Sequence, residues 1–120
     1  SPAFVSHYEG KILNIHPALL PKYPGLDTHQ RVLDAGDEWH GSTVHFVTEE
    51  LDGGPRILAG RLRVDPKETA DELMHRVQAV EHQIYPEAAG LVGSGSVEFI
   101  GGKTWIDGDV AAEPIVRSFD

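Results

Sequence analysis

The sequence predicts an α/β fold: a mixed, mostly parallel sheet with flanking helices, and antiparallel strands toward the carboxyl end of the chain. Polar residues end a short apolar strand over 11–16, where open α/β sheets place their ligands. A short strand pair within 42–64 indicates antiparallel neighbours after that strand. An amphipathic pattern over 70–85 predicts a helix packed on one face of the sheet.

The first predicted strand carries two polar side chains on one face. Because side chains alternate along a strand, Asn14 and His16 share a side. Pro17, which has no backbone N–H, ends the strand at His16. Three prolines within 17–25 then exclude helix and strand while stiffening the segment. This segment is interpreted either as the wall of a pocket or as a surface connector.

A short helix and a second strand come next. Residues 27–30 have the form of a capping box, which predicts a helix from about 28 to 35 that ends at Gly36. Residues 37–41 are typical of a turn, and the β-branched residues of 42–48 predict a strand.

Turn residues separate this strand from the next one. The connection over 49–55 ends in Asp-Gly-Gly-Pro, and a further strand is predicted over 56–64. A second capping box at 69–72 opens the long helix over 70–85. Pro86 is expected to kink or restart that helix, and the glycines that follow are expected to stop it.

The last part of the chain is predicted to be a hairpin and a tail. Strand-forming residues over 96–107 flank Gly101-Gly102, a two-residue hairpin signal. Residues 108–120 are interpreted as a tail.

Composition excludes several classes of protein. The 120 residues suffice for one domain or a piece of one, and 40% hydrophobic with 24% charged residues is ordinary for a soluble globular chain. A formal net charge of −9 argues against a nucleic-acid partner, which requires a basic face. No apolar run approaches a membrane span and no signal-peptide pattern opens the chain, so a cytoplasmic protein without a membrane partner is expected. The absence of cysteine removes disulfides, thiolate metal sites and a thiol nucleophile.

Asn14, His16 and Asp52 form the strongest candidate site. An amide N–H can hold a developing oxyanion, and an imidazole can donate to that oxygen or move a proton. An aspartate on a glycine-rich loop can orient the imidazole or take a proton through water. This trio suits attack of an amine on a carbonyl. On the spacing alone, a structural interpretation is favoured, with a strand-end histidine, a loop anchor and a turn residue, since polar residues are common at turns.

Other polar residues are weaker candidates. The seven histidines show no standard metal-ligand spacing, so no metal is expected. His45 is either a support for Asp52 or a packed strand histidine. Gln78 and Glu81 lie three residues apart on the long helix, where they either grip a polar ligand together or form a solvated face.

Three stretches carry a resemblance to a known family. Residues 14–25, 40–55 and 78–86 resemble signature segments of phosphoribosylglycinamide formyltransferases, the folate-dependent enzymes of purine synthesis. The similarity covers about 1–90 and is looser in the hairpin and tail. Formyltetrahydrofolate hydrolases and methionyl-tRNA formyltransferases share the shorter elements but differ through 17–25, so this segment favours the glycinamide ribonucleotide enzymes.

The resemblance implies transfer of a formyl group from 10-formyltetrahydrofolate, a co-substrate, to the amine of glycinamide ribonucleotide, on a formyltransferase fold. The amine would attack the formyl carbon directly. Asn14 and protonated His16 would stabilise the tetrahedral oxyanion. Asp52 would support His16 and help pass a proton, through ordered water, from the attacking nitrogen to the leaving nitrogen of folate.

The resemblance also implies where the two substrates bind. Part of the folate pocket would be formed mainly by backbone groups that grip the pterin, at Glu49, Glu50, Leu51 and Asp52. Gln78 and Glu81 would hold the phosphate and ribose end of the ribonucleotide.

One part of that family's pattern is missing from this sequence. The family's amino-terminal half, a βαβ unit with a phosphate-binding loop, has no counterpart here, so residues 1–120 are expected to be the carboxyl-terminal catalytic portion. The chain is then expected to need the amino-terminal half as a partner. Two alternatives stay open: a non-catalytic folate-binding or assembly fragment, and a relative of the formyltetrahydrofolate hydrolases.

Overall fold

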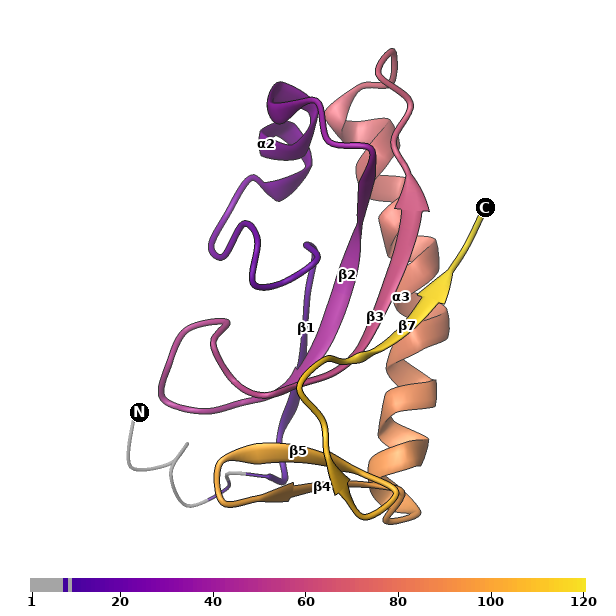
Figure 1. Cartoon of the computed structure of the whole chain (residues 1–120). Helices are drawn as coiled ribbons and strands as arrows, with labels where there is room; N and C mark the ends of the chain where they lie inside the picture. Colours follow the sequence, from indigo (N-terminus) through magenta and orange to yellow (C-terminus); the bar gives the residue numbers. More distant parts are fainter. Residues whose placement is uncertain (1–7, 9) are drawn as a thin grey trace.

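The computed structural model describes residue 8 and residues 10–120. A four-stranded mixed sheet, in the order β1-β2-β3-β7, carries a long helix along one face, and a small three-stranded sheet, β4-β5-β6, lies at one end of that helix (Figure 1). The elements are β1 (Leu13–His16), α2 (Thr28–Ala35), β2 (Trp39–Phe46), β3 (Arg56–Arg63), α3 (Ala70–Gly93), β4 (Val97–Ile100), β5 (Lys103–Ile106), β6 (Asp109–Val110) and β7 (Ile115–Ser118).

The α/β class and the mixed sheet are confirmed, but the parallel share of the described sheet is smaller than predicted. β1 pairs with β2 and β2 with β3 in antiparallel fashion, and β3–β7 is the parallel pair of this sheet. The β2–β3 connection over 47–55 contains no helix, and a short link of this kind returns the chain antiparallel.

The core lies between the sheet and α3. Apolar residues of β2 and β3 meet the predicted stripe of the helix, which is buried along its length. Gly60 on β3 lets the helix approach closely, because a Cβ there would lie 2.4 Å from Val80 Cγ1. The buried core residues are Val32, Val44, Phe46, Ile57, Leu58, Leu62, Leu73, Val77, Val80, Ile84, Ala88 and Val97.

Helix α3 begins as predicted and ends later. The Thr69 hydroxyl accepts from the Glu72 N–H and the Glu72 carboxylate accepts from the Thr69 N–H, so the predicted capping box is present. The helix does not end at residue 85 but continues through Pro86 to Gly93. The helix continues despite the lost backbone hydrogen bond because Ala88 beyond Pro86 is fully buried and Leu91 and Val92 pack against the core.

Helix α2 has the predicted bounds but not the predicted cap. Asp27 lies in the left-handed region, with φ 56°, and its side chain makes no capping hydrogen bond. A capping side chain requires extended backbone, so the capping-box prediction at 27–30 is wrong. The turn predicted over 37–41 is also wrong in part, since β2 already begins at Trp39. The Trp39 ring is held against β3, because the Arg61 Cζ lies 4.1 Å from the centre of the ring.

The predicted hairpin is confirmed and the predicted tail is wrong. Gly101 and Gly102 both have positive φ and connect β4 to β5. Residues 108–120 instead add β6 to β5 and β7 to β3. The β-branched Ile115 and Val116 take the edge of β3 that β2 leaves open. Among residues 8 and 10–120, no helix combines the length and the apolar character that a membrane crossing requires.

Candidate active site

Strand β1 places its two polar side chains on one face, as the alternation predicts. Asn14 lies opposite His45 in the sheet register and is exposed, whereas His16 lies opposite Thr43 and is buried. The strand ends at His16, whose carbonyl accepts from the Ala18 N–H at 2.8 Å in the turn that follows.

The structure brings His16 and Asp52 together. Asp52 Oδ2 lies 3.5 Å from His16 Nδ1, and both side chains are 7% exposed. The same oxygen accepts from the Gly25 N–H at 3.0 Å. Asp52 sits on the β2–β3 loop with φ 52°, and Gly54 lets this loop return beside β2, because a Cβ there would lie 1.8 Å from the Phe46 carbonyl oxygen.

The proline-rich segment 17–25 forms a wall of this site. His16 Nε2 donates to the Tyr23 carbonyl at 2.7 Å. Thr43 holds the near end of the segment, since its hydroxyl donates to the Ala18 carbonyl at 2.8 Å and accepts from the Leu20 N–H at 3.1 Å. The segment therefore lies against His16, which is the position that the pocket-wall interpretation requires.

The Tyr23 side chain fixes the far end of the same wall. Its hydroxyl donates to Asp37 at 2.7 Å. This hydrogen bond raises the pKa of Tyr23 and lowers the pKa of Asp37, because it stabilises the neutral phenol and the charged carboxylate together. The wall is thus tied to the segment between α2 and β2.

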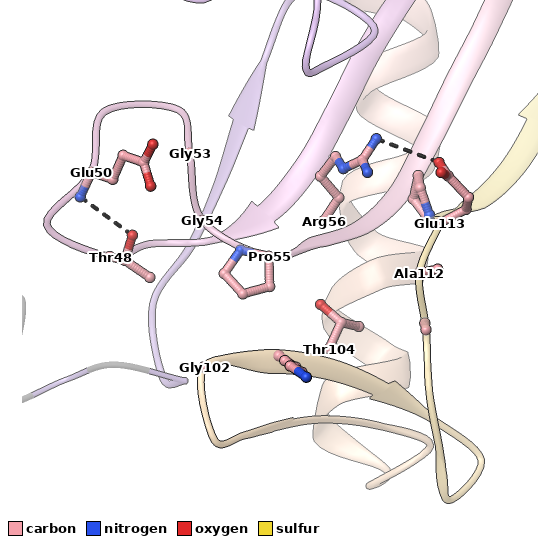
Figure 2. Close-up of a pocket in the computed structure, with 13 residues that line it drawn as sticks. Thr48, Glu50, Gly53, Gly54, Pro55, Arg56, Gly102, Thr104, Ala112 and Glu113 are labelled. Atoms are coloured by element: carbon pink, nitrogen blue, oxygen red, sulfur yellow. Dashed lines mark hydrogen bonds and ion pairs between the residues drawn. The ribbon is translucent and has the colours of Figure 1, made fainter.

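Arg56 connects segment 17–25 with the carboxyl-terminal part of the chain. Arg56 Nη1 donates to the Leu20 carbonyl at 3.0 Å and lies 3.6 Å from Glu113. Figure 2 shows this pair beside a cavity of about 380 Å³ between the β2–β3 loop and the β4–β5 hairpin. Arg56 was not among the sequence-based candidates, since a single arginine that opens a strand carries no pattern.

Within residues 8 and 10–120, His45 has no described contact with Asp52. Its Nδ1 donates to the Phe46 carbonyl at 3.0 Å, and its buried Nε2 has no hydrogen-bond partner within residues 8 and 10–120. The sheet register places His45 opposite Asn14 instead. In this part of the chain it is a packed strand histidine.

The predicted folate-binding residues lie on the exposed β2–β3 loop. Glu49 and Glu50 are exposed, and the Leu51 side chain is 78% exposed. The Glu50 carbonyl accepts from the Gly53 N–H at 3.3 Å, which closes the turn that carries Asp52. An apolar side chain raised on a tight loop is suited to cover a planar ligand.

Of the two candidates on α3, Glu81 faces the protein and Gln78 is exposed. Glu81 Oε2 accepts from the Ser42 hydroxyl on β2 at 2.7 Å. Glu81 also borders a cavity of about 400 Å³. The residues that line this cavity are Ile15, Glu81, His82, Tyr85 and Pro86, so it connects the middle of β1 with the helix and leaves Gln78 outside.

A histidine pair lies between α2 and β2. His29 Nδ1 and His40 Nε2 share a hydrogen bond of 3.0 Å. Burial, followed by the neighbouring His29, lowers the pKa of His40 to about 4. Burial also lowers the pKa of His29, with Glu81 acting in the opposite sense. Across residues 8 and 10–120, no three histidine, aspartate or glutamate side chains are grouped as a metal site requires.

Comparison with known proteins shows which proteins this chain is similar to. A formyl transferase family model matches residues 1–89. The phosphoribosylglycinamide formyltransferase of Escherichia coli strain K12 is 53% identical over 108 residues, which are 90% of this chain and 51% of that protein. The chain therefore spans about half the length of the curated relatives it matches.

Solved structures give the same picture. A phosphoribosylglycinamide formyltransferase from Coxiella burnetii superposes with a TM-score of 0.87 at 45% identity, covering 96% of this chain and 56% of that one. A formyltetrahydrofolate deformylase from Pseudomonas syringae pv. tomato superposes with a TM-score of 0.82 at 27% identity, covering 88% of this chain and 35% of that one. The fold is common to both activities, and sequence identity is higher to the first.

Proposed function

Because this chain belongs to the formyl transferase family, we propose that it is the catalytic portion of a phosphoribosylglycinamide formyltransferase. The reaction moves the formyl group of 10-formyltetrahydrofolate to the amine of glycinamide ribonucleotide, a step of purine synthesis. The observation that carries this proposal is the pairing of His16 with Asp52 at 3.5 Å beneath the wall formed by 17–25.

The proposed chemistry is direct attack of the amine nitrogen on the formyl carbon. A bond from the amine nitrogen to the formyl carbon forms, and the bond from that carbon to the folate nitrogen then breaks. The oxyanion between these steps is stabilised by the Asn14 amide and by protonated His16. Because Nε2 donates to the Tyr23 carbonyl and Nδ1 faces the Asp52 carboxylate, the protonated ring would stabilise the oxyanion through its positive charge.

Asp52 completes the proton balance. The attacking nitrogen must lose a proton, and the departing folate nitrogen must gain one. Asp52 faces His16 Nδ1 and is held by the Gly25 N–H, so its carboxylate stabilises the charged imidazole. The same carboxylate relays the proton through water between the two nitrogens.

Two surfaces are proposed to hold the substrates. The loop residues Glu49, Glu50, Leu51 and Asp52 bind the pterin through backbone groups, and the raised Leu51 side chain covers its face. Gln78 and Glu81 bind the ribonucleotide at its phosphate and ribose end. A carboxylate repels phosphate, so Glu81 is assigned to the ribose hydroxyls and Gln78 to the phosphate side.

The test is formyl transfer by this chain, alone and together with the amino-terminal half of the E. coli relative. The substrates are glycinamide ribonucleotide and a 10-formyl folate analogue, and deformylated folate is followed by absorbance. Transfer that disappears with His16→Ala supports the proposal. Formate release without the ribonucleotide acceptor would favour a hydrolase, and folate binding without either reaction would favour a non-catalytic fragment.

A further inference from the structure

We propose that Ser42 is a positioning residue that sets the orientation of Glu81 toward the ribonucleotide. This inference rests on the proposed function, and it adds a residue that no sequence motif indicated. The serine would act through Glu81 alone, without touching the substrate.

The contact between the two side chains is short and partly buried. Ser42 is fully buried on β2, and its Oγ donates to Glu81 Oε2 at 2.7 Å across the sheet–helix interface. A hydrogen bond from a hydroxyl to a charged carboxylate is stronger than a hydrogen bond between two neutral groups. Removing the hydroxyl would leave one carboxylate oxygen without its protein donor.

The sheet lies close to helix α3 beside Ser42. Ser42 lies opposite Gly60 in the β2–β3 register. A Cβ on Gly60 would lie 2.4 Å from Val80 Cγ1 and 2.9 Å from Ile84 Cγ2, so the helix rests directly on this glycine. Val80 and Ile84 flank Glu81 along α3, and this close approach brings the carboxylate within reach of the serine.

The hydrogen bond makes the two carboxylate oxygens of Glu81 different from each other. Oε2 is taken by Ser42, and Oε1 has no described hydrogen-bond partner within residues 8 and 10–120. Glu81 borders the cavity of about 400 Å³ beside Ile15 and Tyr85. A carboxylate fixed at one oxygen presents the other as a directed acceptor, which suits a sugar hydroxyl and disfavours a phosphate.

The experiment compares steady-state kinetics of Ser42→Ala with wild type in the completed enzyme, formed with the amino-terminal half of the E. coli relative. The KM for glycinamide ribonucleotide is expected to rise about tenfold, the usual scale for losing one hydrogen bond to a charged group. The kcat and the KM for the formyl folate are expected to stay within about twofold. Ser42→Thr keeps the hydroxyl and should restore most of the loss.

Three further variants complete the design. Ser118→Ala removes an exposed serine that also hydrogen-bonds a side chain, that of Arg61, and is expected to change nothing. Glu81→Gln combined with Ser42→Ala should be no worse than Glu81→Gln alone, because both act on one interaction. If Ser42→Ala fails to fold, Ser42→Cys, which has a weak donor of similar size, takes its place with the same expected rise in KM.

The outcomes separate this inference from the proposed function. Transfer activity with an unchanged ribonucleotide KM in Ser42→Ala and Ser42→Cys would overturn the role of Ser42 alone. A loss of kcat without a change in KM would do the same, since it indicates a general structural role. Absence of transfer by the completed wild-type enzyme would overturn both.

Discussion

At the residue scale, the His16 ring lies between two groups from different loops, the Tyr23 carbonyl at Nε2 and the Asp52 carboxylate at Nδ1. The strand alone supplies the histidine, and the loops decide what each ring nitrogen can do. A ring that faces acceptors on both sides is held in one orientation and donates from both nitrogens when it is protonated. The proposed chemistry would therefore depend on Asp52 as much as on His16.

Replacement of Asp52 by asparagine is expected to lower kcat by about 10²- to 10³-fold while changing KM for both substrates little. The amide keeps the size of the side chain but removes the charge that stabilises the imidazolium. Steady-state kinetics of the completed enzyme measures this effect. Asp107→Asn is the matched control, because Asp107 has nearly the same backbone conformation, φ 51° against 52°, in an exposed turn. Equal kcat values for wild type and Asp52→Asn would contradict the assignment.

The buried His40 makes the stability of the chain depend on pH. Its pKa is lowered from 6.5 to about 4 in the folded chain. The unfolded chain therefore binds more protons between these two values, and stability falls as pH falls through that window. The stabilisation is present above about pH 6.5 and is lost by about pH 4, with a loss of at most roughly 3 kcal/mol.

Urea unfolding between pH 7.5 and 4.5 tests this expectation. His40→Asn is expected to lose less stability than wild type across that range, although it is less stable than wild type at pH 7.5. His75→Asn, at an exposed position on α3, serves as the control and should keep the wild-type dependence. Parallel curves for wild type and His40→Asn would contradict the role of His40.

At the element scale, Gly60 sets the distance between α3 and the sheet. Gly60→Ala would place a methyl group 2.4 Å from Val80 Cγ1, so the helix must shift or the strand must bend. A loss of about 1–3 kcal/mol in the free energy of unfolding is expected, as is usual for overpacking a core. Gly90→Ala on α3 is the opposite case, because a Cβ there meets nothing within 4 Å. It should stabilise the chain by roughly 0.5–1 kcal/mol.

Urea unfolding of the two variants under the same conditions provides the comparison. Opposite signs of the change in unfolding free energy are expected for Gly60→Ala and Gly90→Ala. A neutral Gly60→Ala would mean that the helix does not rest on the strand at this glycine, and it would also weaken the argument that links Ser42 to Glu81.

Local sequence patterns predicted an element correctly where the backbone has the conformation that the pattern requires. The capping-box pattern forms its hydrogen bonds at Thr69, whose backbone is extended. It does not form the cap at Asp27, whose backbone is left-handed. Pro86 does not end α3, because burial of Ala88 continues the core beyond it. The parallel pairing of β7 could not be predicted, since four mostly exposed residues show no alternation and their partner is distant in sequence.

In the candidate site, too, local patterns predicted some features, and others depend on tertiary contacts. The side-by-side placement of Asn14 and His16 follows from strand alternation, and the turn chemistry after Asp52 indicates a loop. The contact between this loop and His16 is tertiary, so local sequence patterns do not predict it. The Tyr23 carbonyl and the Ser42 hydroxyl are invisible to motif analysis, because one is a backbone group and the other belongs to an ordinary strand residue.

At the scale of the whole molecule, β1 is the outermost strand of the described four-stranded sheet, at the end opposite β7. It carries the candidate catalytic residues Asn14 and His16. The cavity beside it is lined by the apolar Ile15 and the aromatic ring of Tyr85. An unpaired strand edge beside apolar side chains is a ready surface for pairing with another chain. Since the chain spans 51% of its E. coli relative, the amino-terminal half is the partner that we propose for this edge.

Sedimentation equilibrium is expected to show self-association of this chain alone and a one-to-one complex when the amino-terminal half of the E. coli relative is added. Ile15→Lys replaces apolar surface with a charge in the cavity beside β1 and should weaken that complex by about tenfold or more, because covering a charged group at an apolar contact removes it from water even where a carboxylate such as Glu81 lies nearby. Val116→Lys introduces the same charge at an exposed position on β7, at the opposite edge of the sheet, and should leave the complex intact. A compact monomer that ignores the added half would contradict the assignment of β1 as the joining edge. Equal weakening by both lysines would instead mean that the two chains associate through net charge, since the chain carries −9, and not through this edge.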